Sequence, residues 1–235
     1  GNLYLSFVSG GVSVDFDPGP GVASLPVNVN DGVFLKLDPS GTLIFAKSIS
    51  STSGGWHPIQ NITIDDAQNI YLSGYTDGTC DVDPGAGVIN VTPSGAIFSY
   101  VAKYDVSGNY VWHGTYNGGY TTEMRVNLGT NRLYITGLFN SATFDTDLTA
   151  GTNNLSNNGG YDGFFARYDL NGNHQWSYRM GGSLDDYFQD MDFYRGSQIV
   201  TTSNIQSSGV DINPSAAVTS YSSNGMYDFV LARHG

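Results

Sequence analysis

Pairs of aspartates recur along the chain with an i, i+2 spacing that could hold a divalent cation. Residues two positions apart in extended backbone point to the same side, so the two carboxylates of a pair can converge. Calcium prefers several oxygen ligands and tolerates irregular geometry, and loop carbonyls would complete its shell. The candidate calcium ligands are Asp15, Asp17, Asp81, Asp83, Asp145, Asp147 and Asp211.

The same aspartates also have a structural interpretation. A short Asp side chain accepts hydrogen bonds from the backbone amides of a turn, and both Asp17 and Asp83 precede a proline, which is typical of turns. The chain has no Asp-x-Asp-x-Asp-Gly loop closed by a Glu, and its fourth acidic turn carries Asn213 in place of the second Asp. We therefore expect no cofactor, with calcium at these turns as the alternative.

Two aromatic residues that follow glycine pairs are candidates for ligand binding. Trp56 comes after Gly54-Gly55, and Tyr120 comes after Gly118-Gly119. Exposed aromatic rings beside glycine loops often mark contact surfaces, and they could stack on sugar rings. Packing inside the fold is the competing interpretation. Further members of such an aromatic platform would be Tyr100, Tyr104, Tyr110 and Tyr116.

No residue stands out as catalytic. The four histidines (His57, His113, His174 and His234) share no common sequence context, and no Ser-His-Asp set or glycine-rich phosphate loop occurs. Glu123, the only Glu, could form a glycosidase-type carboxylate pair with Asp185 or Asp186, which stand in an equivalent stretch further along the chain. Solvated loop acids are the interpretation that we favour, because Asp is common at protein surfaces. The sequence thus predicts a protein without enzymatic activity.

Composition excludes several classes of protein. The 235 residues include 31 Gly, 21 acids and only 9 Lys and Arg, which gives a formal net charge of −12. Few Glu and Lys argue against a coiled coil, and 16 Tyr with 12 Phe are too many for a disordered chain. Without a basic cluster the chain is a poor candidate for binding nucleic acid. We expect no membrane span, since no apolar run approaches about 18 residues.

The chain repeats itself. A strand-like run at 69–74 reappears at 132–137 and at 2–6. A less similar copy stands at 198–203. Matching positions are Tyr4, Tyr71, Tyr134 and Val200. The repetition predicts one domain over 1–235 with repeats at 1–61, 62–123, 124–189 and an incomplete 190–235.

The elements that must position all these residues are short β-strands. Each repeat of about 65 residues contains roughly four alternating strands separated by Gly, Asp and Asn turns, and no stretch shows helical spacing. One aromatic, Phe45, Trp112 or Trp176, recurs in register and is expected to pack between strands. Four antiparallel strands per repeat, arranged radially, make a β-propeller. We therefore expect an all-β fold of the propeller type.

The phase of the repeats predicts an open or partial propeller. The chain starts at the second strand of a repeat, near Leu3, and ends at a third strand, over 229–234. Gly235 stands where the Asp of the next hairpin is expected. The first and last repeats each lack one strand, and both supply a second and a third strand, so they cannot merge into one. Exposed strand edges invite pairing, so we expect a protein partner or further blades to cover them.

The motif order resembles a known family. Asp81-Val82-Asp83-Pro84-Gly85, then the Lys103-Tyr104-Asp105 strand with Trp112, then a glycine pair and an Asn-Ile-Tyr strand are similar to the bacterial SBBP β-propeller repeats. The resemblance implies a secreted or cell-surface location in Bacteroidota-type bacteria, where type IX secretion is common. It implies a non-enzymatic scaffold that mediates protein interaction. The alternative is a carbohydrate-binding or carbohydrate-active propeller that works at one face.

Overall fold

The chain folds into strands and turns. The computed structural model describes residues 1–11, 13–51, 55–56, 58–95, 98–196, 198–215 and 217–234. These residues contain no helix, and their paired strands run antiparallel. The predicted all-β class is confirmed. Within the same residues, no helix is long and apolar enough to cross a membrane.

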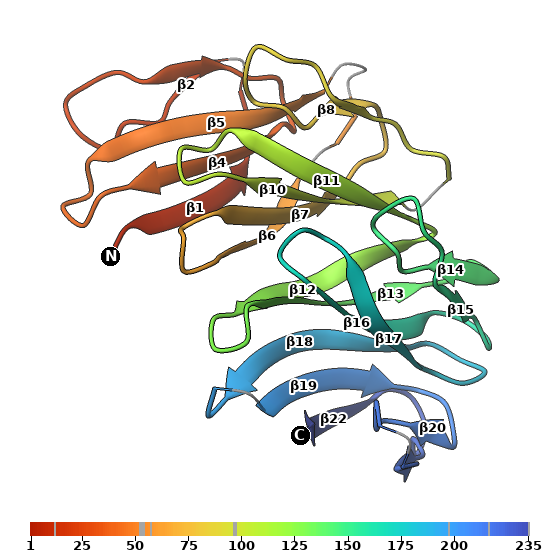
Figure 1. The fold of residues 1–235 in the computed structure, drawn as a ribbon. Helices are drawn as coiled ribbons and strands as arrows, with labels where there is room; N and C mark the ends of the chain where they lie inside the picture. The colour runs from red at the N-terminus through yellow and green to blue at the C-terminus, as the bar shows by residue number, and fades with distance from the viewer. Residues whose placement is uncertain are drawn as a thin grey trace. The chain divides into compact units, whose positions relative to one another are not determined.

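The chain divides into two compact units, Gly1–Thr115 and Tyr116–Gly235 (Figure 1). The strands that begin in the first unit are β1 (Leu3–Val8), β2 (Ser13–Asp15), β3 (Ser24–Pro26), β4 (Gly32–Leu37), β5 (Leu43–Ser51), β6 (Ile59–Ile64), β7 (Ile70–Tyr75), β8 (Cys80–Asp81), β9 (Asn90–Val91), β10 (Phe98–Tyr104) and β11 (Tyr110–Asn117). Its larger sheets have the orders β1-β4-β5-β8-β9 and β11-β10-β7-β6, and β2 pairs with β3 in a hairpin.

The second unit has a similar construction. Its strands are β12 (Gly119–Asn127), β13 (Arg132–Phe139), β14 (Thr143–Asp145), β15 (Asn154–Ser156), β16 (Asp162–Tyr168), β17 (His174–Met180), β18 (Asp186–Tyr194), β19 (Gln198–Ile205), β20 (Val210–Asp211), β21 (Ser220–Tyr221) and β22 (Asp228–His234). Its larger sheets have the orders β12-β13-β16-β17 and β18-β19-β22, and β14-β15 and β20-β21 are short hairpins.

The same strand register recurs in the larger sheets. The paired positions are Tyr4 with Lys36, Tyr71 with Lys103, Tyr134 with Arg167 and Val200 with Arg233. The lysine ammonium groups lie over the tyrosine rings at about 5 Å, a cation–π distance. No sheet closes on itself in the described ranges, so the four-repeat propeller stays a prediction, as do the repeat boundaries.

The turns after β4, β10 and β16 explain the Asp and Gly found there. Gly41, Gly108 and Gly172 have φ values of +87°, +75° and +83°, which favour glycine. Before the first of these turns, Asp38 Oδ1 accepts hydrogen bonds from the backbone N–H groups of Ser40 (2.8 Å) and Thr42 (2.9 Å). Asp and Gly together therefore build these hairpins.

In each unit the two larger sheets pack face to face. In the first unit, Phe34 of β4 contacts Tyr104 of β10, with ring centroids 4.9 Å apart. In the second unit, Phe165 of β16 lies 5.9 Å from Phe188 of β18, and Val230 of β22 belongs to the same core. The aromatics of the fourth strands, Phe45 and Trp176, pack beside these cores, as their repetition predicted.

Three residues named in the sequence analysis, Gly54, His57 and Gly235, lie outside the described residues.

Phe165→Ala is expected to lower the free energy of unfolding of the second unit by about 3–5 kcal/mol, because it empties a fully buried site between two sheets. The control is Leu184→Ala, whose side chain is 46% exposed and which should change stability by less than about 0.5 kcal/mol. Urea unfolding followed by near-UV circular dichroism measures both. Similar losses in the two variants would contradict the core described for this unit.

Candidate functional site

The first Asp of each acidic turn is a hub for backbone hydrogen bonds. Asp81 Oδ1 accepts from the N–H of Asp83 (3.0 Å) and from that of Ile89 (2.8 Å) across the loop. The equivalent carboxylates do the same, each with one amide two residues ahead and one eight residues ahead; they are Asp15, Asp145 and Asp211. One oxygen of each first Asp therefore closes the turn, which confirms the structural role considered for these residues.

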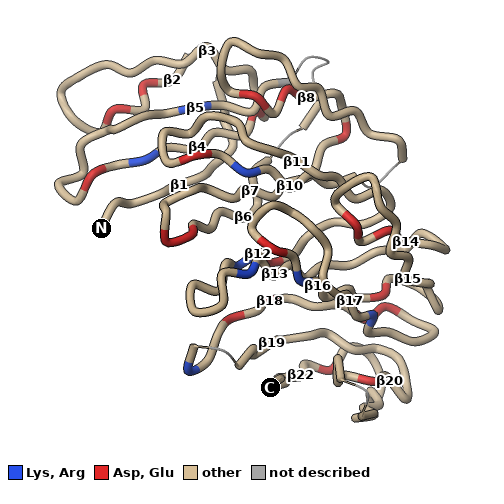
Figure 2. Tube along the Cα trace, viewed as in Figure 1, with Lys and Arg blue, Asp and Glu red and all other residues tan. Residues whose placement is uncertain are grey.

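The second Asp of each pair closes a smaller turn. Asp17, Asp83 and Asp147 each accept a backbone N–H two residues ahead at 2.8 Å. Asn213 makes the same bond to the N–H of Ser215 at 2.9 Å, so the bond does not need a carboxylate. Figure 2 shows acidic residues at the turns beside β2, β8 and β14. The described ranges hold no group of three or more His, Cys, Asp or Glu that could bind a metal, and calcium at these turns stays an untested hypothesis.

A third set of aspartates escaped the sequence analysis. Asp31, Asp162 and Asp228 each accept the N–H of a residue three or four positions earlier, at 2.7 Å, 2.8 Å and 3.0 Å. Asp31 stands just before β4, and Asp162 and Asp228 are the first residues of β16 and β22; Asp162 also pairs with Arg179 at 3.0 Å. Aligning the strands could have revealed them, since all three aspartates occupy the same position relative to the aligned residues of their strands.

The two predicted ligand-binding aromatics lie in different units. Trp56 is 47% exposed, and its ring lies 5.6 Å from that of Tyr75. Its backbone N–H donates to Asp77 Oδ1 at 2.6 Å, so a loop carboxylate fixes this residue. Its side chain is accessible at the surface of the first unit.

Tyr120 lines a pocket of about 250 Å³ in the second unit, together with Leu138, Tyr161, Asp185, Tyr187 and Tyr227. The Asp185 carboxylate accepts the Tyr161 N–H at 2.9 Å and the Tyr227 hydroxyl at 3.1 Å. The rings of Tyr187 and Tyr227 lie 6.1 Å apart, edge to face. Aromatic faces beside a held carboxylate can take a sugar ring or a cation.

The wider aromatic platform does not exist as a surface. Tyr100, Tyr104 and Tyr116 are fully buried. Tyr104 donates its hydroxyl to the carbonyl of Val82 at 2.9 Å, and the Tyr116 and Tyr168 hydroxyls are hydrogen bonded at 2.6 Å. These tyrosines pack inside the units, because alternation placed them on the inner face of their strands. The prediction that they contact ligand was wrong.

The acids considered for catalysis have structural partners. Glu123 sits at a β-bulge of β12, 3.4 Å from Arg125, and burial raises the pKa of its carboxyl. Asp186 is fully buried and accepts the N–H groups of Gly182, Gln206 and Ser207. His113, His174 and His234 each bond a neighbouring hydroxyl. Such bonds fix the loops and strands that carry these groups.

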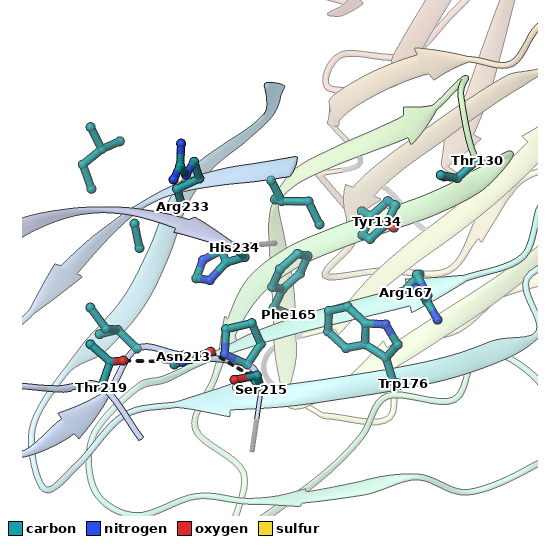
Figure 3. A pocket seen from close by; sticks show the side chains of 15 residues that line it. Thr130, Tyr134, Phe165, Arg167, Trp176, Asn213, Ser215, Thr219, Arg233 and His234 are labelled. Carbon is teal, nitrogen blue, oxygen red and sulfur yellow. Dashed lines mark hydrogen bonds between the residues drawn. The ribbon is translucent and has the colours of Figure 1, made fainter. Parts of the chain in front are cut away.

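A larger groove lies at the edge of β22 in the second unit (Figure 3). Its volume is about 770 Å³. Phe165, Arg167 and Trp176 line it from β16 and β17, while Arg233 and His234 line it from β22. The groove runs along a strand that pairs on one side only, with β19. The phase of the repeats predicted an uncovered strand edge at this place, whereas no pattern in the sequence linked Arg167 or Trp176 to it.

Asp81→Ala is expected to lower the free energy of unfolding by about 1–3 kcal/mol, since two backbone amides lose their acceptor. Asp81→Asn keeps an acceptor oxygen and should retain most of that stability. Thermal melts with calcium and with EDTA complete the test. A melting temperature that falls in EDTA, together with equal losses in the two variants, would support calcium over the turn interpretation.

The melting temperature should fall at acid pH, partly because the carboxylates of Asp15 and Asp38 become protonated. Hydrogen bonds from the amides of Ala23 and Asp17 lower the pKa of Asp15, and those from the Ser40 hydroxyl and the Thr42 amide lower that of Asp38, both below the ordinary 3.8. A lowered pKa stabilises the fold above pH 3.8 and loses this effect as the pH falls through the folded value. The melting-temperature advantage of the wild type over the Asp15→Asn, Asp38→Asn double variant should shrink between pH 6 and about pH 2. An advantage that is constant with pH would refute this assignment.

No family model and no curated protein matches this chain. The resemblance to SBBP repeats therefore stays a prediction that rests on its motifs. The proposals for function rest on the geometry of the two units.

Proposed function

We propose that this chain is a non-enzymatic β-propeller scaffold, secreted or displayed on the bacterial cell surface, that mediates protein interaction. The recurring register of the larger sheets and their face-to-face packing support the propeller. The location follows from the resemblance of the motifs. The observation that carries the interaction is an apolar sheet face on β22 that is left exposed.

The exposed face belongs to the last sheet of the second unit. Val230 points into the core shared with β16, so alternation along the strand places Phe229 and Leu231 on the opposite face. Their side chains are 66% and 67% exposed. Two neighbouring large apolar side chains on one face of a strand mark a surface for protein contact.

The equivalent positions in other sheets indicate what this face would contact. Phe165 occupies the register place of Leu231, two residues before the arginine of its strand, and it is fully buried against Phe188 of the next sheet. Phe34 has the same place in β4 and is fully buried against Tyr104. A further β-sheet, or an equally flat apolar protein surface, is therefore the partner that we propose.

The absence of an enzymatic role is part of the proposal. The aspartates of the acidic turns bond backbone amides, which gives them a role in folding. A general acid or base needs a carboxyl or imidazole free to exchange its proton with substrate.

Carbohydrate binding is the second candidate function. The observation in its favour is the pocket that Tyr120 shares with three further tyrosines and Asp185. Stacking of sugar on tyrosine, with hydroxyls bonded to the carboxylate, is the chemistry that this site offers. Trp56 would be a separate contact in the first unit.

A photo-crosslinking residue in place of Leu231 is expected to give a reproducible protein adduct in the cells that produce the protein. The matched control carries the same residue in place of Val218, which is 75% exposed on a loop and should give no adduct. Mass spectrometry of the adducts is the measurement, and the adduct at position 231 should disappear in a Phe229→Ser background.

Adducts at neither position, combined with binding on a glycan array that Tyr120→Ala or Trp56→Ala abolishes, would replace the scaffold proposal by carbohydrate binding. Hydrolysis of an array glycan would in addition overturn the non-enzymatic assignment.

A further inference from the structure

We propose that the pocket lined by Tyr120 and Asp185 in the second unit binds a small organic cation with a quaternary ammonium group, such as the trimethylammonium group of choline. The pocket has a volume of about 250 Å³, and four tyrosines and one carboxylate line it. This binding function goes beyond the scaffold function and does not depend on it. It also gives the pocket a ligand of a different class from the sugar considered above.

The four tyrosines are two pairs from equivalent places in the two larger sheets of the second unit. Tyr120 of β12 and Tyr187 of β18 form one pair, since each stands opposite the corresponding residue of the following strand. Tyr161 and Tyr227 form the other pair, since each directly precedes the aspartate that begins β16 or β22. Two neighbouring sheets thus contribute the same two rings to one pocket.

The first unit has other residues at these places. Asn30 directly precedes Asp31 and so takes the place of Tyr161. Pro58 takes the place of Tyr120, because the backbone carbonyl of each lies against the glycine of the neighbouring strand. Sheets of this construction therefore form with an amide and a proline at these places, so sheet packing alone does not account for the tyrosines. A ligand that needs aromatic rings accounts for them.

The rings form walls of the pocket on more than one side. The centroids of Tyr187 and Tyr227 lie 6.1 Å apart and their planes are inclined at 70°, so these two rings meet as two walls of a corner. Tyr120 and Tyr161 line the pocket from the neighbouring sheet, against which β18 packs. Leu138 adds an apolar side chain. The face of an aromatic ring attracts a cation, and several rings around one cation add their attractions.

Asp185 supplies a negative charge, and hydrogen bonds fix its position. Its Oδ1 accepts the N–H of Tyr161 at 2.9 Å, and its Oδ2 accepts the hydroxyl of Tyr227 at 3.1 Å. Since each oxygen already accepts one bond, the carboxylate attracts a ligand mainly through its charge. The bond from the Tyr227 hydroxyl also polarises the phenol and makes the face of its ring more negative. Both effects favour a cation in the pocket.

The lining suits a quaternary ammonium better than a sugar or a primary amine. Each hydroxyl of a sugar is both a donor and an acceptor, whereas Asp185 is the only polar lining side chain besides the tyrosines in the described part of the chain. A primary ammonium has three N–H donors, and each needs an acceptor when it leaves water. A trimethylammonium group has no donor, and its methyl groups can contact the tyrosine rings directly.

Volume and net charge define the ligand further. Pockets for drug-sized ligands have volumes of about 300–1,000 Å³, so a pocket of about 250 Å³ suits a smaller molecule. The formal net charge of −12 attracts cations and repels an anionic group attached to them. The ligand is therefore a free cation, and not the zwitterionic phosphocholine headgroup of a lipid.

Choline chloride is the probe, and isothermal titration calorimetry with the full chain measures its binding. Choline should bind saturably and at least about tenfold more tightly than its neutral isostere, in which a tert-butyl group replaces the trimethylammonium group, because the isostere has the same shape but no charge. Ethanolamine keeps the charge but lacks the methyl groups, and it should also bind at least about tenfold more weakly than choline.

Protein variants locate the binding site. Tyr187→Leu removes one ring and should weaken choline binding about tenfold, while Tyr187→Phe keeps the ring and should retain it. Asp185→Asn should weaken the binding of choline but not that of the neutral isostere. Tyr194→Leu changes an exposed tyrosine at the end of β18, outside the pocket, and is the matched control. Thermal melts check each fold, and Tyr227→Leu, at a residue 45% exposed, replaces Tyr187→Leu if that variant does not fold.

Three outcomes overturn the proposal. They are the absence of saturable choline binding, equal affinities for choline and its neutral isostere, and a loss of choline binding that Tyr194→Leu shares with Tyr187→Leu. If choline does not bind but a glycan binds and Tyr187→Leu abolishes that binding, the pocket belongs to the carbohydrate function. The crosslink at position 231 tests the scaffold function alone, so the two proposals stand or fail separately.

Discussion

The structure depends on one constraint: a β-sheet with two apolar faces needs a cover on each. In β16, Phe164 and Phe165 point to opposite faces and both are fully buried. Phe165 packs against Phe188 of the next sheet, while Phe164 packs against Phe144 of the β14 hairpin, with ring centroids 4.9 Å apart. In β22 only one face has such a cover, since Val230 is buried whereas Phe229 and Leu231 are exposed. The proposed function follows from this contrast.

Polar interactions act on the turns that separate the strands, and they leave the sheet faces to apolar packing. Asp81 and its equivalents tie each loop through bonds to backbone amides, which explains why nearly all acids of the chain are Asp. A longer Glu side chain reaches past the local amides. The net charge of −12 is therefore largely a consequence of turn construction. Arg167 is an exception, since this half-buried cation has a buried Nε that finds no acceptor in the described part of the chain.

Much of the fold could be predicted from the sequence because its signals are local. Alternation predicted the strands, and the positive φ of Gly41 and the capping by Asp38 followed from turn chemistry. The complete burial of Tyr100 and Tyr116 could not be predicted from the sequence. Alternation tells on which face of a strand a residue lies but not whether another sheet covers that face. The Tyr120 pocket and the Arg167 groove combine residues far apart in the chain, and only the packing of sheets brings them together.

Hydrogen exchange of the full chain tests most directly whether the sheet containing β22 is incomplete. The account predicts that the backbone amides of β22 that point away from β19 exchange at least a hundredfold faster than those of β16, which is paired on both sides. Equal protection of the amides of β22 and β16 in the isolated chain would contradict it.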